Sequence, residues 1–435
     1  MSVTGWGGVT LTVELDLSQS IGPAGGVTPY DTALWGLGVW GTDLWGAGPV
    51  WTDITASVLG LDLSHGFSYE LDSYQVGRLN LTLDNTSGDF SPDNPSSPYR
   101  LFDETTIAPL RKIRVTGSYA GIEFPLFFGR LDSWDEQFHG QEGGSVAVSA
   151  LDIFADLAAW IGQPTALVGA GETYGNRVAR ILDAAGWKGA RSIDTGRTTV
   201  QATTLAGSAT SLLATASAAE GGVVWADASG MIVAEGRNSL IEKTRSNTTQ
   251  ITFANRDDDT ALLYEADGIN PSYDATLVKN YANYTREGGT AQVYSAQTSR
   301  DLFGDRVDSV TGLANDTDDD VAILARRAIG LNNYPERRVE SLRFQPMRQP
   351  TQARTDLAWS LIAGQALALR SLVRLEHLTP QGFELNRWLF IRGCTHRITP
   401  TDWSVDLTFT SATVWHSLAD SRWGAATWGQ SAWSW

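Results

Sequence analysis

The single cysteine stands close to one of the five histidines, and this pair is the first place to look for catalysis. Cys394 and His396 are two positions apart in an apolar, strand-like stretch, so both side chains point to the same face. A cysteine nucleophile needs a base that can accept its proton. A histidine so near along one strand is poorly placed for that, and Cys394 is predicted to be a small buried hydrophobe.

Other catalytic motifs are missing from the sequence. The remaining histidines form no i, i+4 pair and no His-Glu-x-x-His motif, and one cysteine cannot make a disulfide or a multi-cysteine metal site. There is no Gly-x-Ser-x-Gly elbow, Walker loop or dinucleotide-binding glycine pattern. We therefore predict no catalytic residues, no cofactor, no metal site and no enzymatic activity. A pair of carboxylates brought together by the fold stays open, because glycoside hydrolases take such acids from any sequence positions.

Two acidic runs are candidates for calcium binding. Asp316 and 318–320 precede an apolar helical pattern, where carboxylates interact favourably with the positive end of the helix dipole. The run lacks the alternating ligands, central glycine and terminal glutamate of a calcium loop. Capping is the preferred interpretation, and 257–259 is predicted to be a turn or loop.

The composition is that of a folded protein with an acidic surface. In 435 residues, 42% are hydrophobic and 19% charged, enough for two to four domains with their own cores. The net charge of −17 disfavours nucleic acid and anionic membranes as binding partners. The basic cluster of Arg337, Arg338 and Arg343 is predicted to be a solvated face. No signal-peptide pattern and no run of about 18 apolar residues occurs, so we expect neither secretion by a signal peptide nor a membrane span.

Period-two alternation predicts antiparallel strands in both terminal thirds. Val9, Leu11, Val13, Leu15 and Leu17 share one face of an extended segment, and 79–83 alternates leucine with polar residues. Similar short runs occur at 113–115, 146–148, 373–375 and 405–409. These patterns indicate two β-rich blocks.

The middle of the chain changes to a helical period. Apolar stripes predict helices at about 174–185, ended by Gly186, and at about 209–219, with Ser208 as N-cap. A hairpin is predicted at 223–234, because its central residues 227–230 carry turn-forming Asp and Gly. A third helix is predicted at about 318–331. The fold class is thus mainly β with an α+β middle.

Six tryptophans repeat at a five-residue spacing in two separate segments. They are Trp35, Trp40 and Trp45, and Trp423, Trp428 and Trp433, most of them followed by glycine. This period fits neither a helix nor a strand, so tight turns that each present one indole are predicted. The segments could pack on each other or on their own block, contact another subunit, or bind sugar. The six residues are the candidates for a partner interface.

An ordered series of short motifs carries a family resemblance. They lie at 51–55, 70–72, 83–85, 88–94, 97–99, 113–115 and 125–134. The succession resembles the minor tail proteins of siphophages that infect actinobacteria, and later segments continue it to about Trp415. Residues 18–50 and 417–435, which hold the repeated tryptophans, depart from the family pattern.

The resemblance implies a tail hub with paired antiparallel β-barrels. The predicted domains are a first β-barrel domain at 1–160 with a Trp/Gly-rich insertion at about 18–50, an α+β domain at 161–270, a second β-barrel domain at 271–416 that includes the helix at about 318–331, and a Trp-rich extension at 417–435. Phe90 and Tyr99, in the strongest motif, are predicted to be core anchors.

The resemblance also implies a structural role in the virion. The chain would form a homotrimeric ring at the tail tip, join the tail tube to tip proteins, and line part of the channel for DNA and the tape-measure protein. An acidic lumen would let DNA pass without sticking. Assembly would take place in the bacterial host cytoplasm, with other tail proteins as partners and no membrane contact. The alternative is a carbohydrate-binding or glycan-degrading tail-tip protein that stacks its tryptophans on host-wall sugars.

Overall fold

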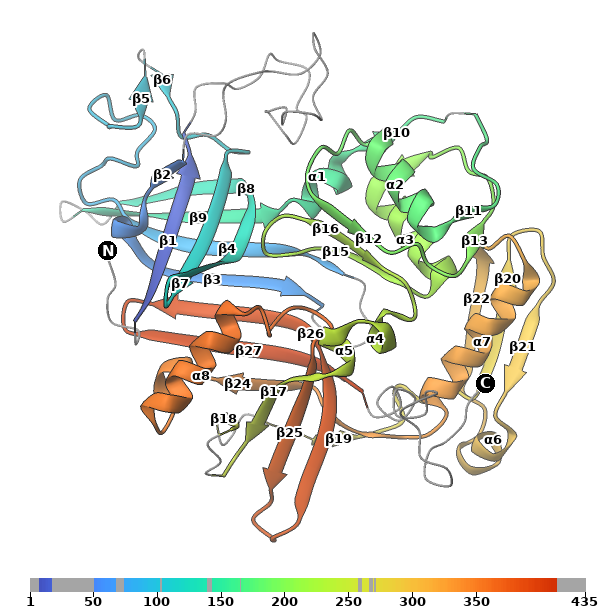
Figure 1. Cartoon of the computed structure of the whole chain (residues 1–435). Helices are drawn as coiled ribbons and strands as arrows, with labels where there is room; N and C mark the ends of the chain where they lie inside the picture. Colours follow the sequence, from blue (N-terminus) through green and yellow to red (C-terminus); the bar gives the residue numbers. More distant parts are fainter. Residues whose placement is uncertain are drawn as a thin grey trace.

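The computed structural model describes residues 8–17, 51–67, 74–101, 104–138, 143–164, 166–256, 260–265, 269 and 271–412 (Figure 1). The six tryptophans of the five-residue repeat and the acidic run 257–259 lie outside these ranges. In the described part of the chain, no helix is both long and apolar enough to cross a membrane.

A 13-stranded mixed sheet dominates the molecule, and it takes strands from both ends of the chain. Its strands are β1 (Val9–Asp16), β2 (Trp51–Asp53), β3 (Val58–Gly66), β4 (Gln75–Asp84), β7 (Lys112–Tyr119), β8 (Ile122–Phe138), β9 (Gly144–Asp152), β17 (Thr249–Ala254), β18 (Leu262–Leu263), β24 (Ser341–Phe344), β25 (Leu372–Leu378), β26 (Glu384–Thr399) and β27 (Asp402–Ser411). The main path runs β18-β17-β25-β26-β3-β4-β9-β8-β7-β1-β2, and β27 pairs with both β26 and β24. Two ladders of β17, with β18 and with β25, are parallel.

The predicted alternation of buried and exposed residues is confirmed. In β4, Leu79, Leu81 and Leu83 are buried while Asn80 and Thr82 are exposed. One face of the sheet therefore covers a hydrophobic core and the other is polar, as expected for half-buried strands. The core under the sheet contains residues from β1 through to β27, so the two terminal blocks share it.

The predicted fold class is confirmed at the level of a mainly β protein. The end strands of the main path, β18 and β2, do not pair with each other, and no ladder among the described residues closes either block into a barrel. The two blocks instead join edge to edge, through the antiparallel ladder between β3 and β26.

The middle region builds a second hydrophobic core from helices and a small sheet. Its elements are α1 (Phe154–Ala159), β10 (Ile161–Gly162), β11 (Glu172–Thr173), α2 (Tyr174–Ala184), β12 (Arg191–Ile193), β13 (Thr199–Val200), β14 (Gly207–Ser208), α3 (Ala209–Glu220), β15 (Val223–Ala226) and β16 (Ile232–Glu235). Both predicted helices and the hairpin are confirmed. The Ser208 side chain accepts a hydrogen bond from the Ser211 amide and caps α3, which ends at Gly221 with a φ of 67°.

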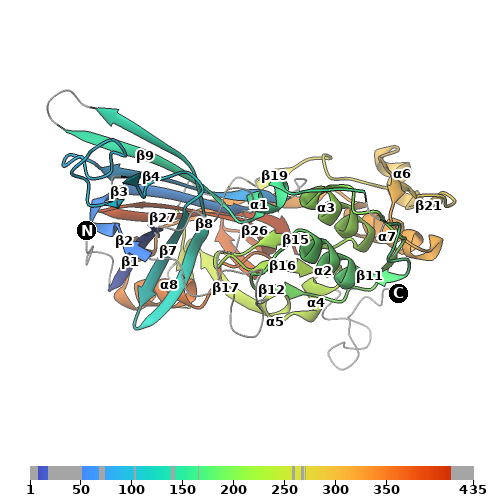
Figure 2. The ribbon, with the colours of Figure 1, turned by 90° about the horizontal axis from the view of Figure 1, so that it is seen from above.

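A third core lies farther along the chain, where one helix covers a three-stranded sheet. The elements are β20 (Tyr281–Arg286), β21 (Gln292–Ser295), α6 (Gln297–Phe303), β22 (Val307–Leu313) and α7 (Asp318–Asn332). The predicted helix at about 318–331 is confirmed as α7. Figure 2 shows the three parts in sequence along the molecule, with the large sheet at one end and α6 and α7 at the other.

Besides α1, α6 and two four-residue helices, one long helix was not predicted. In α8 (Gln352–Ala363), capped by the Thr351 side chain, Trp359 is fully buried and meets the Trp403 ring edge to face at 5.0 Å. Its apolar pattern was missed because the whole segment was interpreted by its strands. The remaining short elements are η1 (Thr55–Ser57), β5 (Arg100–Leu101), β6 (Glu104–Thr105), α4 (Ser239–Glu242), α5 (Thr244–Asn247), β19 (Pro271–Tyr273), β23 (Arg337–Val339) and η2 (Pro346–Arg348).

Candidate functional site

The ladder that joins the two strand blocks depends on two glycines. Strand β26 pairs with β25 over its first half and, after an irregularity between Ile391 and Gly393, with β3 over its second half. A Cβ on Gly66 would lie 2.3 Å from the Arg392 carbonyl oxygen, and a Cβ on Gly393 would lie 2.7 Å from the Phe67 carbonyl oxygen. Only glycine lets the two backbones approach this closely.

Cys394 and His396 point to the same face of β26, as predicted. The Cys394 Sγ lies 3.2 Å from His396 Nε2, and the Trp403 indole donates to His396 Nδ1 at 3.1 Å. Because an indole only donates, Nδ1 is the acceptor, and the proton of the neutral ring sits on Nε2. That N–H donates to the sulfur, so this tautomer has no lone pair with which to accept the thiol proton.

Burial also keeps both groups neutral. Burial lowers the pKa of His396 to about 3, and it raises the pKa of the Cys394 thiol far above its usual value. His65, opposite Cys394 on β3, has its pKa lowered to about 4 by burial. A reactive cysteine needs the opposite environment, exposed and electropositive. The three residues therefore pack the joint between the blocks.

A cavity of about 200 Å³ lies next to these residues. The joint contributes His65, Cys394 and His396 to its wall, and the β15–β16 hairpin contributes Trp225 and Asp227. Sites for drug-sized ligands usually have roughly 300 to 1,000 Å³. This space is smaller, and it marks the place where the two strand blocks meet the middle core.

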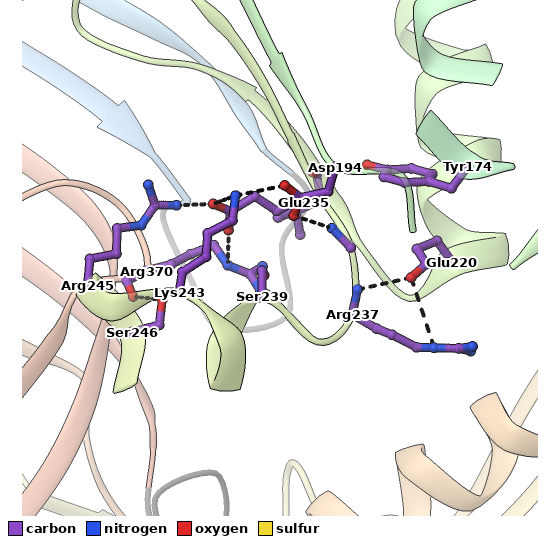
Figure 3. A network of polar contacts seen from close by, with 12 residues as sticks. Tyr174, Asp194, Glu220, Glu235, Arg237, Ser239, Lys243, Arg245, Ser246 and Arg370 are labelled. Atoms are coloured by element: carbon purple, nitrogen blue, oxygen red, sulfur yellow. Dashed lines mark hydrogen bonds and ion pairs between the residues drawn. The ribbon is translucent and has the colours of Figure 1, made fainter. Parts of the chain in front are cut away.

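A buried charge network fastens the same junction (Figure 3). Glu235 at the end of β16 is fully buried, and three cations surround its carboxylate. Lys243 Nζ lies 2.8 Å from one oxygen, Arg370 Nε lies 2.9 Å from the other, and Arg245 forms a further ion pair. Burial alone would raise the pKa of Glu235, but Arg370, Arg245 and Lys243 outweigh it and hold the pKa below its usual value.

The cations come from different parts of the chain, so the network joins them. Lys243 and Arg245 belong to the α4–α5 segment, and Arg370 precedes β25 in the second strand block. The Arg370 guanidinium donates to the Ser239 hydroxyl at 2.7 Å, and its carbonyl accepts from the Ser246 hydroxyl at 2.9 Å. A carboxylate with this many charged partners is a structural fastening.

A second buried carboxylate links the middle and third cores. Glu220, at the end of α3, is fully buried and accepts hydrogen bonds from the amides of Arg197, Thr198 and Arg237. The Arg237 carbonyl in turn accepts from the Arg327 side chain of α7 at 2.6 Å. The middle core is thus tied to the strand blocks on one side and to α7 on the other.

The acidic run at the start of α7 behaves as the capping interpretation predicts. The Thr317 side chain caps α7, and Asp318, Asp319 and Asp320 lie in its first turn. Asp318 accepts from Arg286 at 2.6 Å and from the Thr290 hydroxyl at 2.7 Å. Over the part of the chain that the structure describes, no group of three histidine, cysteine or acidic side chains is arranged to hold a metal ion.

Of the three arginines predicted to form a solvated face, Arg337 is exposed and Arg343 keeps 38% of its side chain exposed. Arg338 is buried and pairs with Asp274 at 2.6 Å, and Arg343 pairs with Asp406 at 2.5 Å. Cross-strand neighbours decide this difference, because each β-sheet position faces a partner from a distant part of the sequence.

In the motif at 88–99, Phe90 is a core anchor, as predicted, and Tyr99 is partly buried and packs against the same core. Phe90 is buried and stacks on Tyr99 at 5.1 Å, and its carbonyl accepts from the Trp134 indole at 3.0 Å. The candidate interface tryptophans lie outside the described residues, so their role stays a prediction. Sequence reasoning missed Glu235 and Glu220, because an isolated glutamate carries no signal of its burial.

Comparison with known proteins identifies the fold of this chain. No protein-family model and no curated protein matches the sequence. Among solved structures, a tail protein from Neisseria meningitidis superposes with a TM-score of 0.56 at 10% identity, covering 95% of this chain and 99% of that one. The 43 kDa tail protein of prophage MuSo2 from Shewanella oneidensis superposes with a TM-score of 0.53 at 14% identity, covering 85% of this chain and 98% of that one.

The chain has a tail-protein fold. The likeness extends through the strand blocks and the cores between them, since it covers 95% of the chain. It concerns the fold alone, because 10% and 14% identity carry no site residues across.

Proposed function

We propose that this protein is a non-enzymatic structural subunit of a phage tail, acting as a homotrimeric hub at the tail tip. The observation that carries the proposal is the fold shared with a tail protein over 95% of this chain and 99% of the other. The order of sequence motifs between 51 and 134 supports the narrower placement among minor tail proteins of siphophages that infect actinobacteria.

The junction is suited to a permanent, load-bearing part. The β3–β26 ladder makes one continuous sheet of the two blocks, and the Glu235 network holds the middle core against them. A buried carboxylate with three cations is costly to open, because any separation leaves charges unpaired at low dielectric. We propose that the two blocks act as a rigid pair of barrel-like units, each at one position of the ring.

The polar face of the sheet is our candidate for the channel lining. In one row across neighbouring strands stand Asp62, Asn80, Ser149 and Ser133, whose side chains are hydrophilic. Arg397 lies 3.9 Å from Asp62, so part of the acidic charge in this row is balanced. A wetted surface of hydroxyl, amide and paired charges would let DNA and the tape-measure protein pass.

The proposed partners are other copies of the chain and the neighbouring tail proteins. The repeated tryptophans at 35–45 and 423–433 are proposed contacts with a partner specific to this tail, since indoles are favoured anchors at interfaces. The division into domains at 1–160, 161–270, 271–416 and 417–435 remains part of this proposal, as do assembly in the host cytoplasm and location at the tail tip.

The mass of the purified chain, measured by light scattering and followed by electron microscopy of the same sample, tests the proposal. Three chains around a central pore are expected. A stable monomer that binds or cleaves host-wall polysaccharide would replace the hub with the carbohydrate alternative.

A further inference from the structure

The two strand blocks repeat one arrangement of their central strands. In each, a long middle strand pairs first with the strand before it and then with the strand after it: β8 with β7 and β9, and β26 with β25 and β27. The irregularity in the second ladder falls between Leu131 and Ser133 in β8 and between Ile391 and Gly393 in β26. Ile391 lies as far along the chain from Leu131 as Gly393 lies from Ser133. The two strands therefore correspond position for position from Phe127 in β8 and Arg387 in β26 onward, because only the β7–β8 ladder shifts its register before that point.

The backbone ahead of these strands supports the correspondence. Leu110 and Arg370, at the same separation, both have left-handed backbones, with φ of 67° and 68°. The Leu110 amide donates to the Leu131 carbonyl at 2.8 Å, and the Arg370 amide donates to the Ile391 carbonyl at 2.7 Å. A non-glycine residue rarely adopts this conformation, so its recurrence at equivalent positions is strong evidence for a structural repeat.

The repeat extends to the next strands. β4 pairs with β9 in the same way as β24 pairs with β27. Because β23 directly precedes β24 in the chain, β23 and β24 together correspond to β4. The antiparallel partner of β4 is β3, and the antiparallel partner of β23 is β19. In this correspondence Ser64 of β3 matches Pro271 of β19.

The blocks differ in what lies beside the long strand. The second half of β26 is covered by β3, and Ile398 there is 2% exposed. The equivalent half of β8 has β9 on one side and, within the described residues, no strand on the other, and Phe138, equivalent to Ile398, is 75% exposed. The other side of β19 likewise has no strand partner among the described residues, and Tyr273 is 67% exposed.

Within the residues that the structure describes, each chain thus has an open edge that matches β26 and an open edge that matches β3. In Figure 1, β8 lies above the β3–β26 joint and β19 below it. An exposed strand edge presents unpaired amide and carbonyl groups, which favours pairing with another chain. Two different edges that fit each other make a head-to-tail contact, and such contacts close into rings when the rotation permits.

We propose that β19 of one copy pairs antiparallel with the open edge of β8 in the next copy, and so repeats between subunits the joint that β3 and β26 form within one chain. The inference rests on the proposed ring and names its interface. The correspondence also gives the register: since Ser64 stands opposite Thr395, Pro271 should stand opposite Asp135 of the next copy. Tyr273 and Ser133 of the next copy take the places of Gly66 and Gly393, so the two strands should lie there at ordinary ladder spacing, without the close approach of the joint within one chain. A ring of three chains would then contain six similar joints, with joints within a chain alternating with joints between chains.

Register-specific cross-linking in the full-length chain tests this interface. Asp135→Cys and Pro271→Cys change two exposed positions, and buried Cys394 with its raised thiol pKa should not compete. Mixing the two single variants under mild oxidation should give disulfide-linked dimers, because directly opposed residues have Cα atoms about 4.5 to 5.5 Å apart. The chain with both changes should give covalent trimers.

A matched control shifts the register by two residues on the same strand. Gln137→Cys mixed with Pro271→Cys should give at least about tenfold less dimer, because a two-residue shift moves the Cα atoms apart by roughly 6.6 Å, beyond the usual reach of a disulfide. Equal yields from both mixtures would overturn the proposed register.

The outcomes separate this inference from the proposed function. Rings seen by light scattering and microscopy without the Asp135–Pro271 cross-link would overturn the β8–β19 interface and leave the hub intact. A chain that is monomeric and uncross-linked at every concentration reached counts against both. As a second readout, the amides of 133–138 should exchange hydrogen at least about tenfold more slowly in rings than in dilute monomer, whereas those of 393–398 should stay protected in both.

Discussion

Replacing Glu235 with glutamine should loosen the junction while changing almost no volume. Glutamine keeps the shape of the side chain but removes the negative charge that faces Lys243, Arg245 and Arg370. Lys243 retains Asp194 at 2.9 Å, so the loss falls mainly on the two arginines. Of these, Arg370 is the more buried, with 12% of its side chain exposed against 31% for Arg245.

The expected magnitude follows from this burial. Leaving a buried charge without its partner costs about 3 to 5 kcal/mol, while exposed ion pairs contribute about 0 to 1 kcal/mol. With one well-buried and one partly exposed arginine, we expect a loss near the lower value, about 3 kcal/mol. This corresponds to roughly a hundredfold increase in the local opening equilibrium.

Hydrogen exchange followed by mass spectrometry measures this opening in the peptides that span 232–246. Local exchange is suited to the question, because a chain with several cores need not unfold in a single transition. The matched control is Glu384→Gln, which removes an exposed ion pair with Arg256 at 2.7 Å. If Glu235→Gln accelerates exchange no more than Glu384→Gln, the network does not fasten the junction and our reasoning is wrong.

Three further results are expected. Because the folded pKa of Glu235 is lowered, its ionised carboxylate stabilises the fold above the unfolded pKa of about 4.5, and this stabilisation is lost as the pH falls through the lower folded pKa. Acid should therefore destabilise the wild type more than it destabilises Glu235→Gln. Parallel curves of stability against pH for the two proteins would contradict this. Gly66→Ala should lower the free energy of unfolding by at least about 2 kcal/mol and speed hydrogen exchange in 393–398, because its Cβ would clash with backbone at a φ of 104°. The control is Gly330→Ala in α7, where a Cβ meets nothing within 4 Å, and it should be neutral or stabilising by up to about 1 kcal/mol. Equal effects of the two changes on melting temperature would refute the close approach. Cys394 should resist a thiol reagent at pH 8 until the protein is unfolded, and rapid labelling of the native chain would show that the joint opens readily.

Local sequence signals were sufficient to predict the elements whose ends are set by capping or turn residues. The Ser208 cap and Gly221 bound α3, and Thr317 with the acidic run begins α7, so each signal lies at the helix end that it sets. The hairpin at Gly230 is likewise set by its own turn, where Asp227 accepts from the amides of Ser229 and Met231. Such hydrogen bonds form between neighbours in the chain, so their residues can be recognised in sequence.

The candidate site follows a different rule, and its charged part was not predicted. Cys394 was correctly expected to be buried, since it stands in an apolar strand pattern. Glu235 looks like any other acidic residue, because its three cations arrive from 243, 245 and 370 only after the chain has folded. The same reason explains why Arg338 and Arg343 turned out to be paired.

By itself, the sequence determined the mainly β class, the α+β middle with its helices, and the resemblance to tail proteins. Only the tertiary structure decided that β3 lies against β26 and that the two strand blocks share one sheet and one core. Alternation along a strand specifies which side chains face the core, but the two edges of a strand carry the same backbone amides and carbonyls whatever the sequence. The choice of edge partner therefore depends on close approaches such as that of Gly66 to Gly393, which form between residues more than three hundred positions apart.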